Sequence, residues 1–175
     1  MLGKQLIICV ETNRQCKSDW MYIKSTIEQY YAINNSDIKL SPVYMNGKGN
    51  YKSNKVKKEV ATLIKQYAAG TEKGSESHVI YAIDSDEYFA NAEDAAFIKN
   101  VVKYCKGNNY ELIWFCRDIE EVYLGKRIEK REKEREATAF LQNHRIKTIK
   151  SEILKSENVT LGRSNILLIL DKYLL

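Results

Sequence analysis

Residues 4–11, with the sequence KQLIICVE, form a short apolar run that is rich in β-branched residues and ends on a carboxylate. Such a run is typical of a strand that is buried on both faces of a parallel sheet. After a polar loop, residues 18–31 place Trp20, Ile23 and Ile27 at helical spacing,. A buried strand followed by an amphipathic helix predicts the beginning of a βαβ unit.

The same alternation of strands and helices continues to residue 116. Further elements are expected, in chain order, at residues 38–45 (strand), 54–69 (helix), 78–83 (strand), 94–105 (helix) and 110–116 (strand),. Pro42 lacks a ladder donor and therefore favours an edge position for its strand or a bulge within it. The pattern predicts an α/β domain with a mainly parallel four-stranded sheet and helices on both faces.

The pattern changes after residue 116. Residues 118–125 have helical patterning, and residues 126–136 (KRIEKREKERE) are almost entirely charged. Interleaved charges at helical spacing predict a solvent-exposed helix, with a contact to nucleic acid or protein as the alternative. Residues 146–154 and 161–175 are expected to pack back as terminal helices. The expected organisation is therefore an α/β domain over residues 1–125 and a helical C-terminal extension over residues 126–175.

Length and charge limit the class of protein. The chain has 175 residues, 28 Lys plus Arg against 23 Asp plus Glu, and a formal net charge of +5. Its longest strongly apolar run, residues 166–170, is much shorter than the roughly 20 residues of a membrane helix. The N-terminus has no signal-peptide pattern. We expect a cytoplasmic domain that does not enter a membrane, and the charge is compatible with a nucleic acid partner.

Three carboxylates stand at the ends of predicted strands. Glu11 ends the first strand, and Asp84 and Asp86 follow the third. Ligands of open parallel sheets bind beyond the carboxyl ends of the strands, so these acids are expected to converge if the two strands are neighbours. Carboxylates two residues apart in extended backbone point the same way, so Asp84 and Asp86 could both face one ion. The alternative is that these acids cap the next helix or lie in a solvated loop.

A cluster of carboxylate oxygens suits Mg²⁺ or Mn²⁺. Such an ion can neutralise charge on a phosphodiester and activate a nucleophile. The turn Gly47-Lys48-Gly49-Asn50 lacks the P-loop spacing, but its backbone amides could bind phosphate at the start of the second helix; the alternative is a simple turn,. Lys48, Lys52 and Lys55 lie in the same region and are candidate contacts for the phosphates of a nucleic acid.

The order of these motifs resembles the Toprim fold in its RloB-like branch, over roughly residues 5–126. The resemblance is carried by five segments, which are Cys9-Val10-Glu11, Ser18-Asp19-Trp20-Met21-Tyr22-Ile23, Gly47-Lys48-Gly49-Asn50, Ile83-Asp84-Ser85-Asp86 and Asp118-Ile119-Glu120-Glu121-Val122-Tyr123-Leu124. The resemblance implies a three-layer Toprim-like domain. It also implies that Glu11 acts as general acid or base, that Asp84 and Asp86 bind Mg²⁺, and that Glu120 is a further candidate acid.

The resemblance further implies a nuclease of bacterial phage defence that acts beside an ABC-type ATPase partner. The chain departs from the family pattern in three ways. Thr12 replaces the glycine after the glutamate, the loop between Glu11 and the first helix is longer, and Lys126 stands where the family often has histidine. A catalytically inactive adaptor, or a nucleic-acid-binding subunit of a larger complex, is therefore the alternative function. The choice between DNA and RNA, and the formation of a homo-oligomer, stay open.

Overall fold

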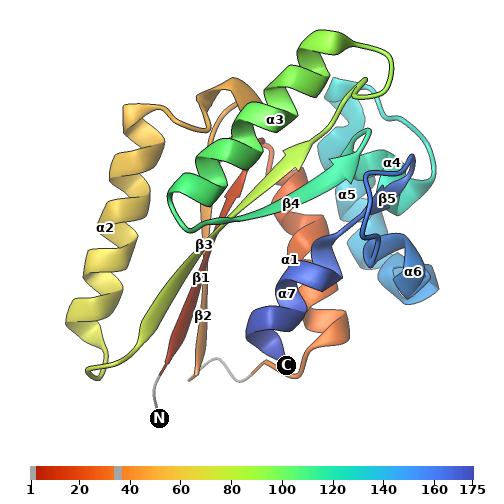
Figure 1. The fold of residues 1–175 in the computed structure, drawn as a ribbon. Coiled ribbons are helices and arrows are strands. Elements are labelled where there is room, and N and C mark those ends of the chain that lie inside the picture. The colour runs from red at the N-terminus through yellow and green to blue at the C-terminus, as the bar shows by residue number, and fades with distance from the viewer. Residues whose placement is uncertain (1–2, 34–36) are drawn as a thin grey trace.

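A five-stranded sheet forms the centre of the computed structural model, which describes residues 3–33 and 37–175 (Figure 1). The strands are β1 (Lys4–Val10), β2 (Ile38–Tyr44), β3 (Glu76–Asp84), β4 (Glu111–Cys116) and β5 (Arg163–Ser164). Their order is β2-β1-β3-β4-β5; the first four run parallel, and β5 runs antiparallel to β4. The predicted α/β class with a mainly parallel sheet is confirmed. The predicted number of four strands is wrong, because Arg163 and Ser164 pair with the end of β4.

Helices connect the strands and cover both faces of the sheet. They are α1 (Ser18–Tyr30), η1 (Lys48–Asn50), α2 (Asn54–Gly70), α3 (Ala92–Gly107), α4 (Ile119–Leu124), η2 (Lys130–Glu132), α5 (Lys133–Gln142), η3 (Arg145–Thr148), α6 (Ser151–Leu154) and α7 (Ile166–Leu174). Every strand and helix expected before residue 116 is present, with boundaries displaced by two residues at most. In the part of the chain that the structure describes, no helix has the length and apolar character needed to cross a membrane.

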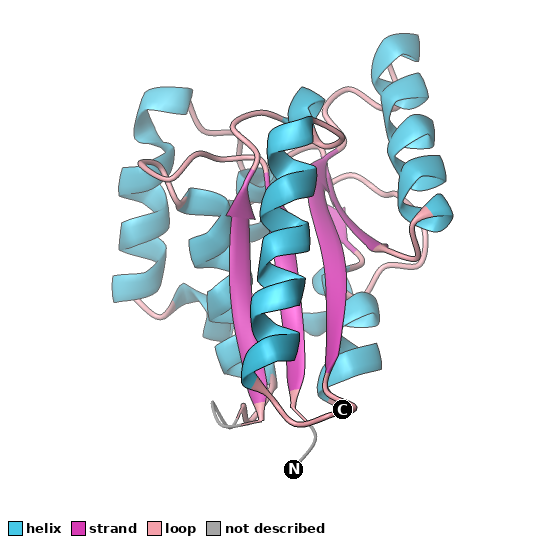
Figure 2. Cartoon of the chain, turned by 90° about the vertical axis from the view of Figure 1, so that its left-hand side faces the viewer, coloured by secondary structure: helices cyan, strands magenta, loops and turns pink. Residues whose placement is uncertain are grey.

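Alternate side chains of the central strands enter two different hydrophobic cores. Leu6 and Ile8 of β1 pack with α1, α4, α5 and α7, whereas Ile7 and Cys9 pack with α2 and α3. Figure 2 shows helices on both sides of the strands. Because both faces are covered, β1 is apolar at nearly every position, which is the pattern that the sequence presents.

The strand order explains which helix covers which face. The chain moves from β1 to β2 on one side of the sheet, and then from β2 across β1 to β3 and on to β4. Right-handed crossovers in opposite directions place α1 on one face and α2 and α3 on the other. The direction of winding therefore reverses between β1 and β3. The edge position predicted from Pro42 is confirmed, because β2 pairs only with β1 among the described strands.

The C-terminal region differs from its expected form. Residues 126–136 are not one exposed helix: a short turn, η2, precedes α5, which begins at Lys133 and buries Ala137 and Phe140. The ring of Phe140 lies 5.0 Å from that of Tyr22, between ring centroids. The expected terminal helices are also shorter, since η3 and α6 replace the first and β5 precedes α7 in the second. Charge alternation marked an exposed face in this segment but did not identify the face that packs.

Replacement of Phe140 tests the packing of α5. Phe140→Ala is expected to lower the free energy of unfolding by about 3–5 kcal/mol, because it leaves a cavity beside Tyr22 and Tyr123,. Urea unfolding measures this loss. Phe89→Ala is the matched control, because Phe89 is 61% exposed, and it is expected to change the stability by less than about 0.5 kcal/mol,. Equal effects of the two substitutions would contradict the packing of α5 against α1.

Candidate functional site

The carboxyl ends of β1 and β3 bring two of the candidate acids together. The two strands are neighbours, with Cys9 paired to Tyr81, so Glu11 and Asp84 emerge at the same edge of the sheet. The backbone N–H of Asp84 donates to Glu11 Oε1 at 2.7 Å. Asp84 Oδ1 in turn accepts a hydrogen bond from the backbone N–H of Ile119 at 3.0 Å. The site therefore lies at the point where the winding of the sheet reverses, which is the usual position of ligand sites in open α/β sheets.

A third carboxylate, that of Asp19, joins this pair. The sequence suggested Asp19 only as part of the family resemblance. In the structure Asp19 Oδ2 accepts a hydrogen bond from the backbone N–H of Thr12 at 3.1 Å, and the residue is buried. Lys17 is the N-cap residue of α1, and it makes no side-chain capping bond. The sequence feature that could have identified Asp19 as a site residue is its position as an acid in the first turn of the helix that follows β1.

Glu120 and Lys133 complete the cluster. Glu120 belongs to α4, and its side chain is fully buried. Its Oε2 accepts a hydrogen bond from Lys133 Nζ at 2.8 Å, whereas its Oε1 has no hydrogen-bond partner among the described residues. Lys133 was expected to lie on an exposed helix. The resemblance suggested Glu120 as a further acid, and the structure places it beside the other carboxylates through this lysine.

Burial and mutual repulsion raise the pKa values of these acids. Burial raises the pKa of Glu11 to about 8, against the lowering effect of the Asp84 N–H and with a smaller raising effect of Asp19 and Asp86. Burial also raises the pKa of Asp84 well above its usual range, and the charges of Glu11, Asp19 and Glu120 add to the increase. The pKa values of Asp19 and Glu120 are raised by burial and lowered by Lys133.

Lys133 provides positive charge inside the cluster. Burial alone would lower the pKa of Lys133, but Glu120, Asp84 and Asp19 reverse this effect and raise the pKa above its usual value. The ammonium group therefore stays charged at neutral pH. One lysine faces four carboxylates, so the cluster would have an excess of negative charge if all four were ionised, and a bound cation would favour that ionisation.

A cavity of about 380 Å³ opens at this cluster. Glu11, Asp19 and Asp84 line it together with Lys130 and Lys133, so its wall carries charges of both signs. Gly47 also lines the cavity, and its N–H donates to the backbone oxygen of Glu11 at 2.7 Å. Gly47 has a φ of 112°, a conformation that favours glycine,. The glycine-rich turn thus forms part of the cavity wall.

Asp86 takes a different direction from Asp84. The expectation that both carboxylates point the same way assumed extended backbone, but Asp86 has a left-handed φ of 45°. Its side chain forms an ion pair with Lys48, which also contacts Asp94 at 3.2 Å between Nζ and Oδ1. Asp86 is not among the described residues that line the cavity. In the described part of the chain, no group of three or more His, Cys, Asp or Glu side chains is arranged as a metal site.

The three lysines that are candidate phosphate contacts do not form one cluster. Lys48 is bound to Asp86 and Asp94, and these acids raise its pKa against the lowering effect of its burial. Lys52 and Lys55 are exposed at the start of α2. The Nζ of Lys52 lies 5.6 Å from the centre of the Tyr51 ring. Neither of these two lysines lines the carboxylate cavity.

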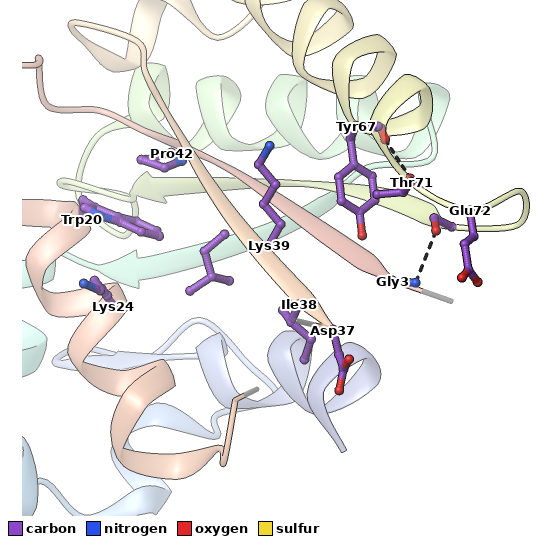
Figure 3. Close-up of a pocket in the computed structure, with 13 residues that line it drawn as sticks. Gly3, Trp20, Lys24, Asp37, Ile38, Lys39, Pro42, Tyr67, Thr71 and Glu72 are labelled. Carbon is purple, nitrogen blue, oxygen red and sulfur yellow. Dashed lines mark hydrogen bonds between the residues drawn. The ribbon is translucent and has the colours of Figure 1, made fainter. Parts of the chain in front are cut away.

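A larger cavity lies away from the carboxylates. It has a volume of about 700 Å³ and follows the outer edge of β2 (Figure 3). Trp20 and Tyr67 lie along it, and it ends beside Gly3, whose N–H donates to Ser75 Oγ at 3.3 Å. Its charged lining residues are of both signs, and none of the predicted site residues takes part. We therefore assign the candidate site to the smaller cavity.

Comparison with known proteins gives no match, either to a protein-family model or to a curated protein. The class of protein that the fold defines is an α/β domain with a polar cavity at the switch between β1 and β3,. Its activity has to be inferred from the residues of that site, since fold alone does not establish function.

The raised pKa values predict that stability depends on pH. Between about pH 5 and pH 8 the folded protein binds more protons at Glu11 and its neighbours than the unfolded chain does,. The free energy of unfolding is therefore expected to fall as the pH rises, by at most about 1.4 kcal/mol per pH unit for each shifted group. Urea unfolding in EDTA at several pH values measures the slope. Glu11→Gln should make it shallower, and a flat profile for the unsubstituted protein would contradict the raised pKa values.

Proposed function

We propose that the chain is a Mg²⁺-dependent nuclease that cleaves phosphodiester bonds of DNA or RNA. Within this proposal it is a Toprim-like effector of a bacterial anti-phage defence system, with an ABC-type ATPase as its partner. The observation that carries the proposal is the convergence of Glu11, Asp19, Asp84 and Glu120 at the switch between β1 and β3. The assignment to the Toprim-like class is supported by the order of the motifs along the sequence.

The donor atoms of the cluster are chemically suited to a hard divalent cation, and the side chains would have to close around it, because the described residues are not arranged as a metal site. All four acids offer oxygen atoms, which are the ligands that Mg²⁺ and Mn²⁺ prefer. The buried Glu120 Oε1 has no hydrogen-bond partner among the described residues, and the pKa values of the acids are raised. Both observations are expected where a cation neutralises buried carboxylates. Asp19 and Asp84 line the cavity and are the residues that would hold the ion, which would supply charge neutralisation at the phosphodiester when bound, and Glu11 beside them is left to carry the proton,.

The side chains of this protein contribute proton transfer and charge. A pKa near 8 allows the carboxyl group of Glu11 to take up or release a proton close to neutral pH, as a general acid or base must,. Lys130 lines the same cavity and can contact phosphate oxygens, whereas Lys133 is paired with Glu120,. Asp86 pairs with Lys48 and is not among the described residues that line the cavity, so it is left out of this ligand set.

A second candidate function is a catalytically inactive adaptor or nucleic-acid-binding subunit. It is favoured by the lysines that already pair with the acids: Lys48 with Asp86, and Lys133 with Glu120. In this case internal ion pairs stabilise the edge of the sheet, and the fold presents a surface to a partner. The two functions differ in one measurable property, which is cleavage that depends on a divalent cation.

Replacement of Asp84 separates these functions. Asp84→Asn keeps the acceptor for the Ile119 N–H but removes a charge, and it is expected to lower Mg²⁺-dependent cleavage of labelled DNA or RNA by about a hundredfold or more,. Binding of Mn²⁺, followed by titration calorimetry, is expected to weaken in parallel. Glu157→Gln, which removes an exposed acid, is the control and should leave both properties unchanged. Cleavage that persists in a folded Asp84→Asn protein would overturn the assignment, and metal-independent complex formation without cleavage would favour the adaptor.

A further inference from the structure

Positive charge is concentrated on the face of the sheet that α2 and α3 cover. The segment from Lys48 to Gly70 and helix α3 together contain nine lysines and three acidic residues, although the whole chain has a net charge of only +5. Two of the three acids are already paired, Glu59 with Arg14 and Asp94 with Lys48. This face therefore carries a local excess of positive charge that the overall composition conceals.

The charged segment before and within α5 is different. Arg131 pairs with Glu129 at 2.9 Å, and Arg135 pairs with Glu132 at 3.0 Å. Lys133 is bound to Glu120. The opposite charges of that segment therefore form ion pairs with one another. By contrast, eight of the nine lysines on the face that α2 and α3 cover form no ion pair within the described chain. These eight are Lys52, Lys55, Lys57, Lys58, Lys65, Lys99, Lys103 and Lys106.

A groove of about 410 Å³ separates the start of α2 from the second half of α3. Lys52 and Lys103 line it together with Asn100 and Asn108, and none of the described residues that line it is acidic. Its lining also includes Tyr51 and Tyr104, whose rings pack edge-on at 5.3 Å between centroids. Two cationic side chains therefore share the groove with a packed aromatic pair.

The lysines of α3 extend the groove along the helix. Lys99, Lys103 and Lys106 are exposed and occur at intervals of four and three residues, so they lie on one face of α3,. They span about 10 Å along the helix axis at 1.5 Å per residue. A row of cations on this scale matches a chain of phosphates better than a single small anion.

We propose that this lysine groove, formed by Lys52 and Lys103 with Asn100 and Asn108, holds the phosphate backbone of a nucleic acid strand. The contact is separate from the carboxylate cavity, since the two cavities share no lining residue. In this proposal the lysine groove, and not Lys48, is the main basic contact for the phosphates. Lys48 already forms ion pairs with Asp86 and Asp94. The inference that the lysine groove positions the substrate of a nuclease rests on the proposed function. The inference that the groove binds nucleic acid requires only its charge.

The test measures binding in EDTA, where metal-dependent cleavage is absent. Lys52→Gln combined with Lys103→Gln is expected to weaken binding of a short labelled DNA or RNA oligonucleotide by about tenfold at low salt, and to reduce the slope of log K against log salt by roughly one to two. Fluorescence anisotropy over a salt series gives both quantities. The matched control is Lys147→Gln with Lys150→Gln, which removes two exposed lysines from the region of η3 and should change neither. Melting temperatures establish that both double variants are folded.

Three outcomes would overturn the inference. They are the absence of nucleic acid binding by the unsubstituted protein, equal losses in the two double variants, and equal or tighter binding of polyglutamate at the groove. Cleavage of a small phosphodiester, bis(p-nitrophenyl) phosphate, with Mn²⁺ distinguishes the two proposals. If the groove inference fails but the nuclease exists, this activity persists and depends on Asp84. If the nuclease is absent but the groove binds, the oligonucleotide result stands without any cleavage.

Discussion

The parallel pairing of β1 with β3 is the constraint on which the rest of the structure depends. The register brings both strands to the same edge of the sheet, so Glu11 and Asp84 emerge together. The Asp84 N–H donates to the Glu11 side chain there. This bond holds two acids close together at a place where burial opposes their ionisation,. The surrounding elements either supply positive charge to this point or close the space around it.

The C-terminal region meets this electrostatic requirement as well as completing the core. Helix α4 buries Glu120, and α5 supplies Lys133 to neutralise it. Phe140, about two helical turns further along α5, fixes that helix against Tyr22 and Tyr123,. Hydrophobic packing thus positions a charged group that would not remain in the site through its ion pair alone, since desolvation offsets much of the attraction in a buried pair.

Charge is divided between two parts of the molecule. Acidic side chains gather at the carboxyl edge of β1 and β3, whereas unpaired lysines gather over α2 and α3. The topology produces this division, because the reversal of winding between β1 and β3 puts α2 and α3 on the face opposite α1,. A substrate with a negative backbone could contact the basic face while its reacting group lies at the acidic edge. The modest net charge of the chain does not reveal this arrangement.

The sequence by itself determined the strands and helices up to residue 116, the edge position of β2, and the placement of Glu11 and Asp84 at the carboxyl ends of two strands; that these strands are neighbours came from the structure. Apolar periodicity and the Pro42 backbone constraint are local, and parallel strands bring their carboxyl ends to one edge. Only the tertiary structure decided that Asp19 turns to the Thr12 N–H, that Lys133 points inward, and that Asp86 turns away. These outcomes depend on partners from distant segments. The period of a segment specifies which of its side chains share a face, but it does not specify which distant charge that face will meet.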